Sequence, residues 1–130
     1  MPKDPAVKRM ARRDVSILIQ HLYKIPKIRY ASISDEMGRR IVGGMKPGVI
    51  SATEPNDEVR LALHSIVSLK TAESYEKYTG KVEYLCISWE KMFAVFFLLK
   101  GSRCMALTFE KSADQKSVIR RALRLIKEVE

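Results

Sequence analysis

Eight apolar residues in succession, Met92–Leu99, lie between two short turn segments, Glu90-Lys91 and Gly101-Ser102. A transmembrane helix needs about 20 consecutive apolar residues, so this run is far too short to cross a bilayer. Its length and composition are instead typical of a central β-strand that is covered on both faces. The sequence therefore has to supply a sheet and layers that pack against both sides of it.

Hydrophobic periodicity predicts three helices and five strands along the chain. The helices are Ala6–Lys24, Thr53–Lys77 and Ser112–Val129, and the strands are Ile28–Ile33, Arg40–Met45, Val82–Trp89, Met92–Leu99 and Arg103–Phe109. Because hairpins join most of the strands, the order α-β-β-α-β-β-β-α predicts an α+β sandwich with a five-stranded antiparallel sheet. Residues 1–130 are expected to form one domain, with residues 1–5 as a polar tail.

The same patterns predict the helix starts and part of the core. Thr53 or Asn56 is expected to cap the second helix, and Ser112 with Gln115 matches a capping box for the third. The alternating strands predict a core that includes Val95, Phe97, Leu99, Leu107 and Phe109.

No residue pattern in the sequence points to catalysis or to a metal. His21, His64, Cys86 and Cys104 show no ligand spacing, and two cysteines are too few for a disulfide framework. The carboxylates of the predicted turns and first helical turns are explained by capping and solubility. We therefore expect a non-enzymatic chain without a catalytic residue, metal or cofactor.

A glycine-containing segment that begins in the second strand and runs past its end allows two interpretations. Gly43, Gly44, Lys46 and Gly48 could form a loop that binds an anion, but the segment lacks the lysine and hydroxyl spacing of a phosphate-binding P-loop. A plain turn with structural glycines is the simpler hypothesis.

Basic residues exceed acidic ones, 24 against 15, which gives a net charge of +9. In the third helix Lys116, Arg120, Arg124 and Lys127 form one stripe, and the first helix adds Arg9, Arg12 and Arg13. If both helices cover the same face of the sheet, these stripes could join into one positive surface for an acidic partner or nucleic acid. The alternative is a solvated surface, since aromatic residues for base stacking are not interleaved with the cations.

The second helix has an unusual outer side. A period of about 100° per residue predicts a core face of Val59, Ala62, Leu63, Ile66 and Leu69. Nearly opposite lie Leu61, Ser65, Ser68 and Ala72, which carry no charge although the protein is highly charged. Such a seam favours close packing of another helix, and antiparallel self-association is its simplest use.

The order of elements resembles the roadblock family, whose members are small non-enzymatic modules with a profilin-like sandwich. The resemblance covers nearly the whole chain. It implies homodimers formed through the second helix and the following strand, here Leu61, Ser65, Ser68 and Ala72 with Val82, Tyr84 and Cys86. It also implies partners such as small Ras-like GTPases or larger scaffold and motor complexes.

Three local segments, Lys27–Ala31, Asp35–Gly38 and Val42–Gly48, resemble a family of short archaeal proteins without an assigned activity. The sequence as a whole predicts a cytoplasmic homodimeric module with a regulatory or scaffold role, with no membrane span. A basic nucleic-acid-binding protein is the second hypothesis, and a small-ligand sensor is the third.

Overall fold

The computed structural model describes residues 12–51 and 54–130. Its elements are α1 (Arg12–Leu22), β1 (Ile28–Ser34), β2 (Arg40–Met45), α2 (Pro55–Glu73), α3 (Glu76–Thr79), β3 (Leu85–Ser88), β4 (Met92–Leu99), β5 (Arg103–Glu110) and α4 (Gln115–Val129). The predicted α+β order is confirmed, with the single-turn α3 as an addition. Residues 6–11 of the predicted first helix lie outside the described residues.

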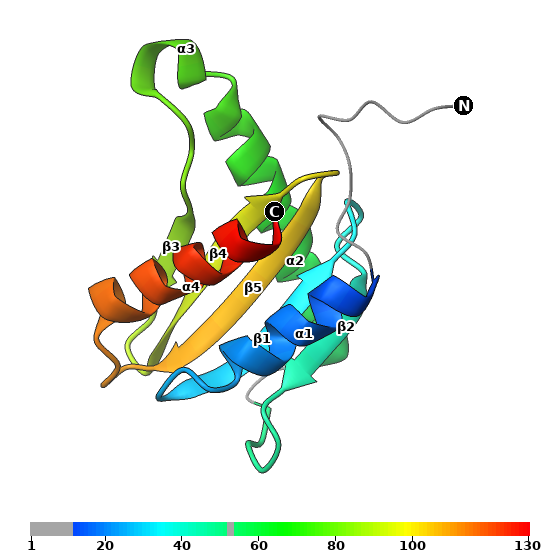
Figure 1. Ribbon diagram of the computed structural model, residues 1–130, viewed down its shortest axis with the longest axis vertical. Helices are drawn as coiled ribbons and strands as arrows, with labels where there is room; N and C mark the ends of the chain where they lie inside the picture. Colours follow the sequence, from blue (N-terminus) through cyan, green and yellow to red (C-terminus); the bar gives the residue numbers. More distant parts are fainter. Residues whose placement is uncertain (1–11, 52–53) are drawn as a thin grey trace.

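The five strands form one antiparallel sheet in the order β2-β1-β5-β4-β3. α1 and α4 lie beside each other on one face, and α2 crosses the opposite face (Figure 1). β4 therefore has a layer on each side, which explains its continuous apolar sequence. β2 and β3 are the two edges of the sheet.

Each face of the sheet has its own apolar cluster. Val95, Phe97, Leu99, Leu107 and Phe109, the core residues predicted from the sequence, are at most 3% exposed and pack beneath α1 and α4. On the other face, Phe96 and Ala94 of β4 pack with α2.

The orientation of α2 about its axis corrects the predicted core face. Ala62, Ile66 and Leu69 are buried as predicted, but Val59 and Leu63 are 40% and 38% exposed. The face of α2 that packs on Phe96 combines the large residues Ile66 and Leu69 with the small residues Ala62 and Ser65. The prediction was wrong because the hydrophobic periodicity of a helix does not show which side chains of the sheet will pack against it.

The helix boundaries also differ from the predictions. α2 ends at Glu73 rather than Lys77, and it begins after Glu54, whose side chain makes no capping bond. Asn56 lies inside the helix, and Thr53 is outside the described residues.

The predicted capping box of α4 is wrong. Asp114 is the N-cap, and its carboxylate accepts from the Ser117 amide at 3.5 Å. Ser112 Oγ instead accepts from Lys27 Nζ at 2.9 Å, and Gln115 Nε2 donates to Cys86 Sγ at 2.8 Å. Both residues are used in tertiary contacts, so neither is available for the local motif.

Candidate interaction surfaces

The free edge of β3 is the first candidate surface. Trp89 N–H donates to the Met92 carbonyl at 2.8 Å, and the β3–β4 register continues from this pair. Because hydrogen-bonded and non-bonded pairs alternate along an antiparallel ladder, Cys86 and Ser88 direct their backbone N–H and C=O groups away from β4. These groups line an edge that no described residue covers with a further strand.

The opposite edge, β2, is protected by its own irregularity. The register slips between Ile33 and Ser34, and Gly43 and Gly44 have φ of +96° and +146°. Bulges and twisted glycines of this kind discourage pairing with another chain. β3, with the sequence Leu-Cys-Ile-Ser, has no such device and is the edge better suited to pairing.

One flank of α2 adjoins β3. Leu61 of α2 and Leu85 and Ile87 of β3 are half-buried and pack against the same apolar cluster. Ser68, on the same side of the helix as Leu61, is exposed. We call β3 together with this flank of α2 the β3 surface.

The structure places the predicted interface residues unequally on the β3 surface. Ser65 is only 2% exposed and its Oγ donates to the Leu61 carbonyl at 2.8 Å, so it faces the sheet rather than an outer seam. Ala72, Val82 and Cys86 are half-buried, and Tyr84 is 42% exposed with its ring centroid 6.3 Å from that of Phe97.

A second apolar strip on α2 was missed by sequence reasoning. Val59, Leu63 and Val67 are all at least 38% exposed, on the flank beside the β1–β2 turn. A Cβ at Gly38 in that turn would lie 2.9 Å from the Val59 carbonyl oxygen. The glycine marks a close approach in the sequence, but nothing in the sequence says which helix it approaches.

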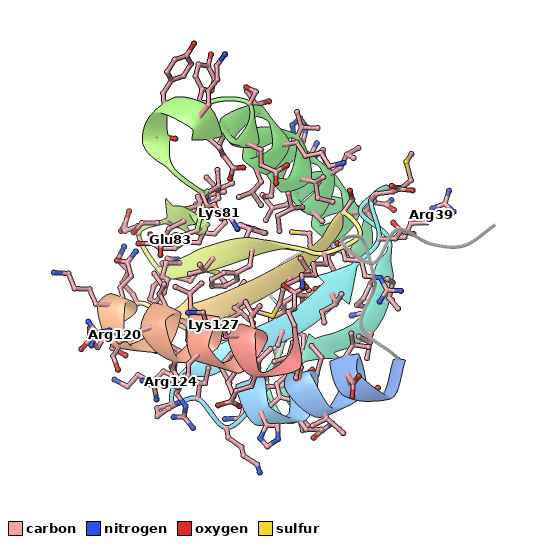
Figure 2. The ribbon with its side chains drawn as sticks, turned by 45° about the horizontal axis from the view of Figure 1, so that its top comes forward. Arg39, Lys81, Glu83, Arg120, Arg124 and Lys127 are labelled. Carbon is pink, nitrogen blue, oxygen red and sulfur yellow. The ribbon has the colours of Figure 1, made fainter. Side chains whose placement is uncertain are left out.

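The outer side of α4 is basic. Lys116, Arg120, Arg124 and Lys127 are all exposed, and Figure 2 shows Arg120 and Arg124 on the margin of α4 away from the strands. α1 covers the same face of the sheet, as the merged surface requires. Arg12 and Arg13 are the first residues of α1, and Arg9 lies outside the described residues.

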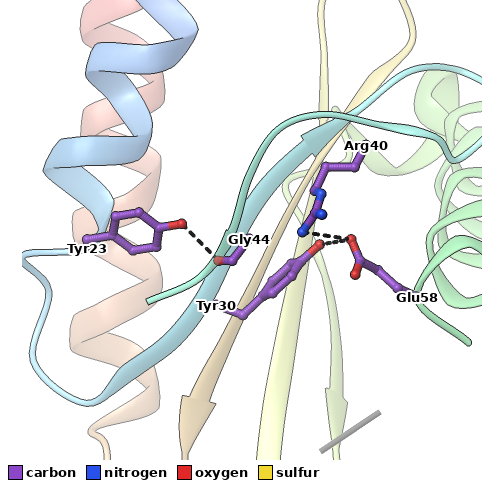
Figure 3. Close-up of polar contacts among 5 residues, drawn as sticks. All are labelled: Tyr23, Tyr30, Arg40, Gly44 and Glu58. Atoms are coloured by element: carbon purple, nitrogen blue, oxygen red, sulfur yellow. Dashed lines mark hydrogen bonds and ion pairs between the residues drawn. The ribbon is translucent and has the colours of Figure 1, made fainter. Parts of the chain in front are cut away.

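Gly43 and Gly44 have structural roles in β2. Gly44 carbonyl oxygen accepts from Tyr23 Oη at 2.8 Å (Figure 3), and Lys46 N–H donates to the Arg29 carbonyl. The two glycines are therefore strand residues, as the predicted strand Arg40–Met45 has them, and the alternative of a ligand loop that includes them is wrong. An anion held by Lys46 and Gly48 stays a prediction.

A partly buried polar cluster joins α2 to the β1–β2 hairpin. Tyr30 Oη donates to Glu58 Oε1, which also lies 3.8 Å from Arg40 Nη1 (Figure 3). Burial, and then the neighbouring Glu58 carboxylate, raise the pKa of Tyr30 well above its ordinary value. The phenol thus stays protonated as a donor, and the cluster anchors the start of α2.

The described residues contain no arrangement that we can assign to catalysis. Burial raises the pKa of Cys104 to about 12, so its thiol is not an activated nucleophile. Within residues 12–51 and 54–130, no three His, Cys, Asp or Glu side chains are grouped to hold a metal ion. In the same ranges, no helix is both long and apolar enough to span a membrane.

A cleft of about 310 Å³ lies where α1 ends and α4 begins. Lys27, Ser112, Ser117 and Arg121 are among its lining residues. The cleft opens at the end of the layer formed by α1 and α4. That it binds a small ligand stays a prediction.

Comparison with known proteins extends the description of the fold. No family model and no curated protein matches the sequence. Among solved structures, MglB from Thermus thermophilus is similar at a TM-score of 0.64 and 15% identity, over 97% of this chain and 99% of that one. MglB from Myxococcus xanthus is similar at 0.64 and 12% identity, over 91% and 95%.

A Roadblock/LC7 domain from Streptomyces avermitilis is similar at a TM-score of 0.62 and 14% identity, over 88% of this chain and 92% of that one. Identities this low show the fold alone. The chain has the roadblock/LC7 fold, as its order of elements predicted.

Proposed function

We propose that this chain is a non-enzymatic module that forms a homodimer through the β3 surface and serves as a regulatory or scaffold subunit. The observation that carries the proposal is the unprotected edge of β3 beside a partly apolar flank of α2. The roadblock fold supports it, since the resemblance implies dimers formed through the same two elements. One of the similar MglB structures is itself described as a tetrameric arrangement.

Pairing of two β3 strands would satisfy backbone groups that otherwise bond only to water. The outward groups of Cys86 and Ser88 would enter a continuous ladder, giving a sheet that extends through both copies. Each such bond adds about 0.5–1.5 kcal/mol. Burial of Leu61, Leu85 and Ile87, all half-buried in one copy, would add an apolar contribution.

The dimer is tested by the variant Ser68→Arg. Ser68 is exposed in one copy, so arginine leaves the fold intact, but a long charged side chain would separate the two copies of α2. We expect the mass from light scattering to fall from twice 14.9 kDa to 14.9 kDa. Circular dichroism should remain unchanged.

The matched control is Ser16→Arg, which makes the same change at an exposed position on α1, away from the β3 surface. It should remain dimeric. A Ser68→Arg variant that keeps the dimer mass over a dilution series would contradict the proposed interface.

The partner class rests on the resemblance to roadblock proteins and is tested separately. We expect the immobilised dimer to retain a purified small Ras-like GTPase and to distinguish its GDP-bound form from its GTP-bound form. If the dimer retains neither form, small Ras-like GTPases are excluded as partners. The proposal that the chain forms a dimer is not affected by that result.

A further inference from the structure

The outer side of α4 carries cations that no carboxylate of the described residues neutralises by an ion pair. Lys116, Arg120, Arg121, Arg124 and Lys127 are exposed, and the ion pairs of Arg40 with Glu58 and of Arg60 with Asp57, within residues 12–51 and 54–130, include none of them. A helix that needed only solubility would gain from alternating charges at i and i+4. This helix instead repeats positive charge at Lys116, Arg120 and Arg124, and Glu128 in its last turn is the first acidic residue of that series.

The acidic residues of the α4 segment are at its ends, and two of the three have other bonds. Asp114 caps the helix, and Glu130 Oε2 accepts from the Lys100 amide at 2.8 Å. Lys27 extends the positive surface, because its Nζ reaches Ser112 at the start of α4. The field over this side of the molecule is therefore positive from one end of the helix to the other.

The chemistry of this side favours a phosphate polymer over a membrane. Helices that lie in a bilayer interface insert an apolar face, but the apolar face of α4 is used in the core and none of its large hydrophobic residues is exposed. Three of the five cations are arginines, whose guanidinium groups bind phosphate oxygens in pairs.

We propose that the outer side of α4 binds the phosphate backbone of double-stranded nucleic acid without reading its sequence. Lys116 and Lys127 are eleven residues apart, which is about 16 Å along a helix. This length spans several phosphates of one strand, whose axial spacing is about 3.4 Å. Contacts to phosphate position a protein on a duplex but carry no base information.

Dimerisation would double this surface, and this step alone rests on the proposed function. Gln115 at the start of α4 contacts Cys86 of β3, so α4 begins beside the edge at which two copies would meet. The two helices would then lie on one face of the joint sheet. Binding by a single copy does not depend on this arrangement.

The test is the anisotropy of a fluorescently labelled duplex of mixed sequence, titrated with the whole protein from 50 to 200 mM salt. If each copy contacts four phosphates, affinity should fall about 10²-fold over this range for one α4 and about 10⁴-fold for two. An affinity independent of salt would overturn the proposal.

The diagnostic variant is Arg120→Gln with Arg124→Gln, and the matched control is Arg39→Gln with Lys70→Gln. Both pairs remove two exposed cations and leave the same net charge, and Figure 2 shows Arg39 far from α4. The first pair should weaken binding at least about tenfold and reduce the magnitude of the salt slope by about one for each lost contact. The control should behave as the unmodified protein does.

Further outcomes distinguish this proposal from a general effect of charge, from membrane binding and from the proposed dimer. Equal weakening by both pairs, or binding to phosphatidylserine vesicles without binding to the duplex, would overturn it. The Ser68→Arg variant distinguishes it from the dimer: loss of the dimer should lower the salt dependence but leave the effect of Arg120 and Arg124 in place.

Discussion

Replacing Gly43 with alanine is expected to lower the free energy of unfolding by about 3 kcal/mol or more, or to prevent folding. The residue has φ of +96°, and an added Cβ would lie 2.2 Å from the Ala31 carbonyl oxygen and 2.8 Å from the Ser32 Cα. Both atoms belong to the backbone of β1, so no side chain can move aside. The hairpin would have to separate where β1 pairs with β2.

Gly48→Ala is the matched control for this prediction. Its φ is +86°, but an added Cβ would meet nothing within 4 Å, so only the backbone conformation resists the change. We expect a cost of about 1–2 kcal/mol. Urea unfolding followed by circular dichroism measures both variants, and equal destabilisation would show that β1 does not approach Gly43 so closely.

The second large effect is expected from Ser65→Arg, which should fail to give a folded protein. Ser65 is 2% exposed between α2 and the sheet, where Ile66, Leu69 and Phe96 form an apolar cluster, and a guanidinium there would bring a charge into apolar surroundings. Removal of an ordinary contact costs 0.5–3 kcal/mol, whereas an unpaired buried charge belongs to the small class that exceeds this range. Thermal unfolding and circular dichroism measure the loss.

Two substitutions control for this result. Ser65→Ala removes only the hydroxyl bond to the Leu61 carbonyl and should cost about 1 kcal/mol or less. Ser68→Arg places the same side chain three residues further along α2, at an exposed position, and should fold. A well-folded Ser65→Arg protein would show that α2 is oriented as its sequence periodicity predicts, with Ser65 outward.

The order of elements was predictable because the hydrophobic period of each helix or strand is set by residues that are close together in the sequence. β2 and β4 begin and end at the predicted residues, Arg40–Met45 and Met92–Leu99, where turn residues and period change coincide. α4 carries a strongly one-sided apolar stripe, so its buried residues Val118, Ile119 and Ala122 lie on the expected side.

What could not be predicted depends on contacts between distant segments. The orientation of α2 follows from the side chains of the sheet below it, and Ser112 and Gln115 bind Lys27 and Cys86 instead of each other. Tyr30 and Glu58 are 28 residues apart, and no spacing rule joins them. The sheet order, in turn, decides that α1 and α4 share a face and that β3 is an edge.

The role of β3 as a pairing edge is tested most directly by hydrogen exchange at the Cys86 and Ser88 amides. In one copy these amides point away from β4, toward the open edge. Paired strands in a dimer should make both exchange slowly, and the Ser68→Arg monomer should make both exchange fast. Fast exchange at both amides, in a sample that light scattering shows to be dimeric, would contradict the account.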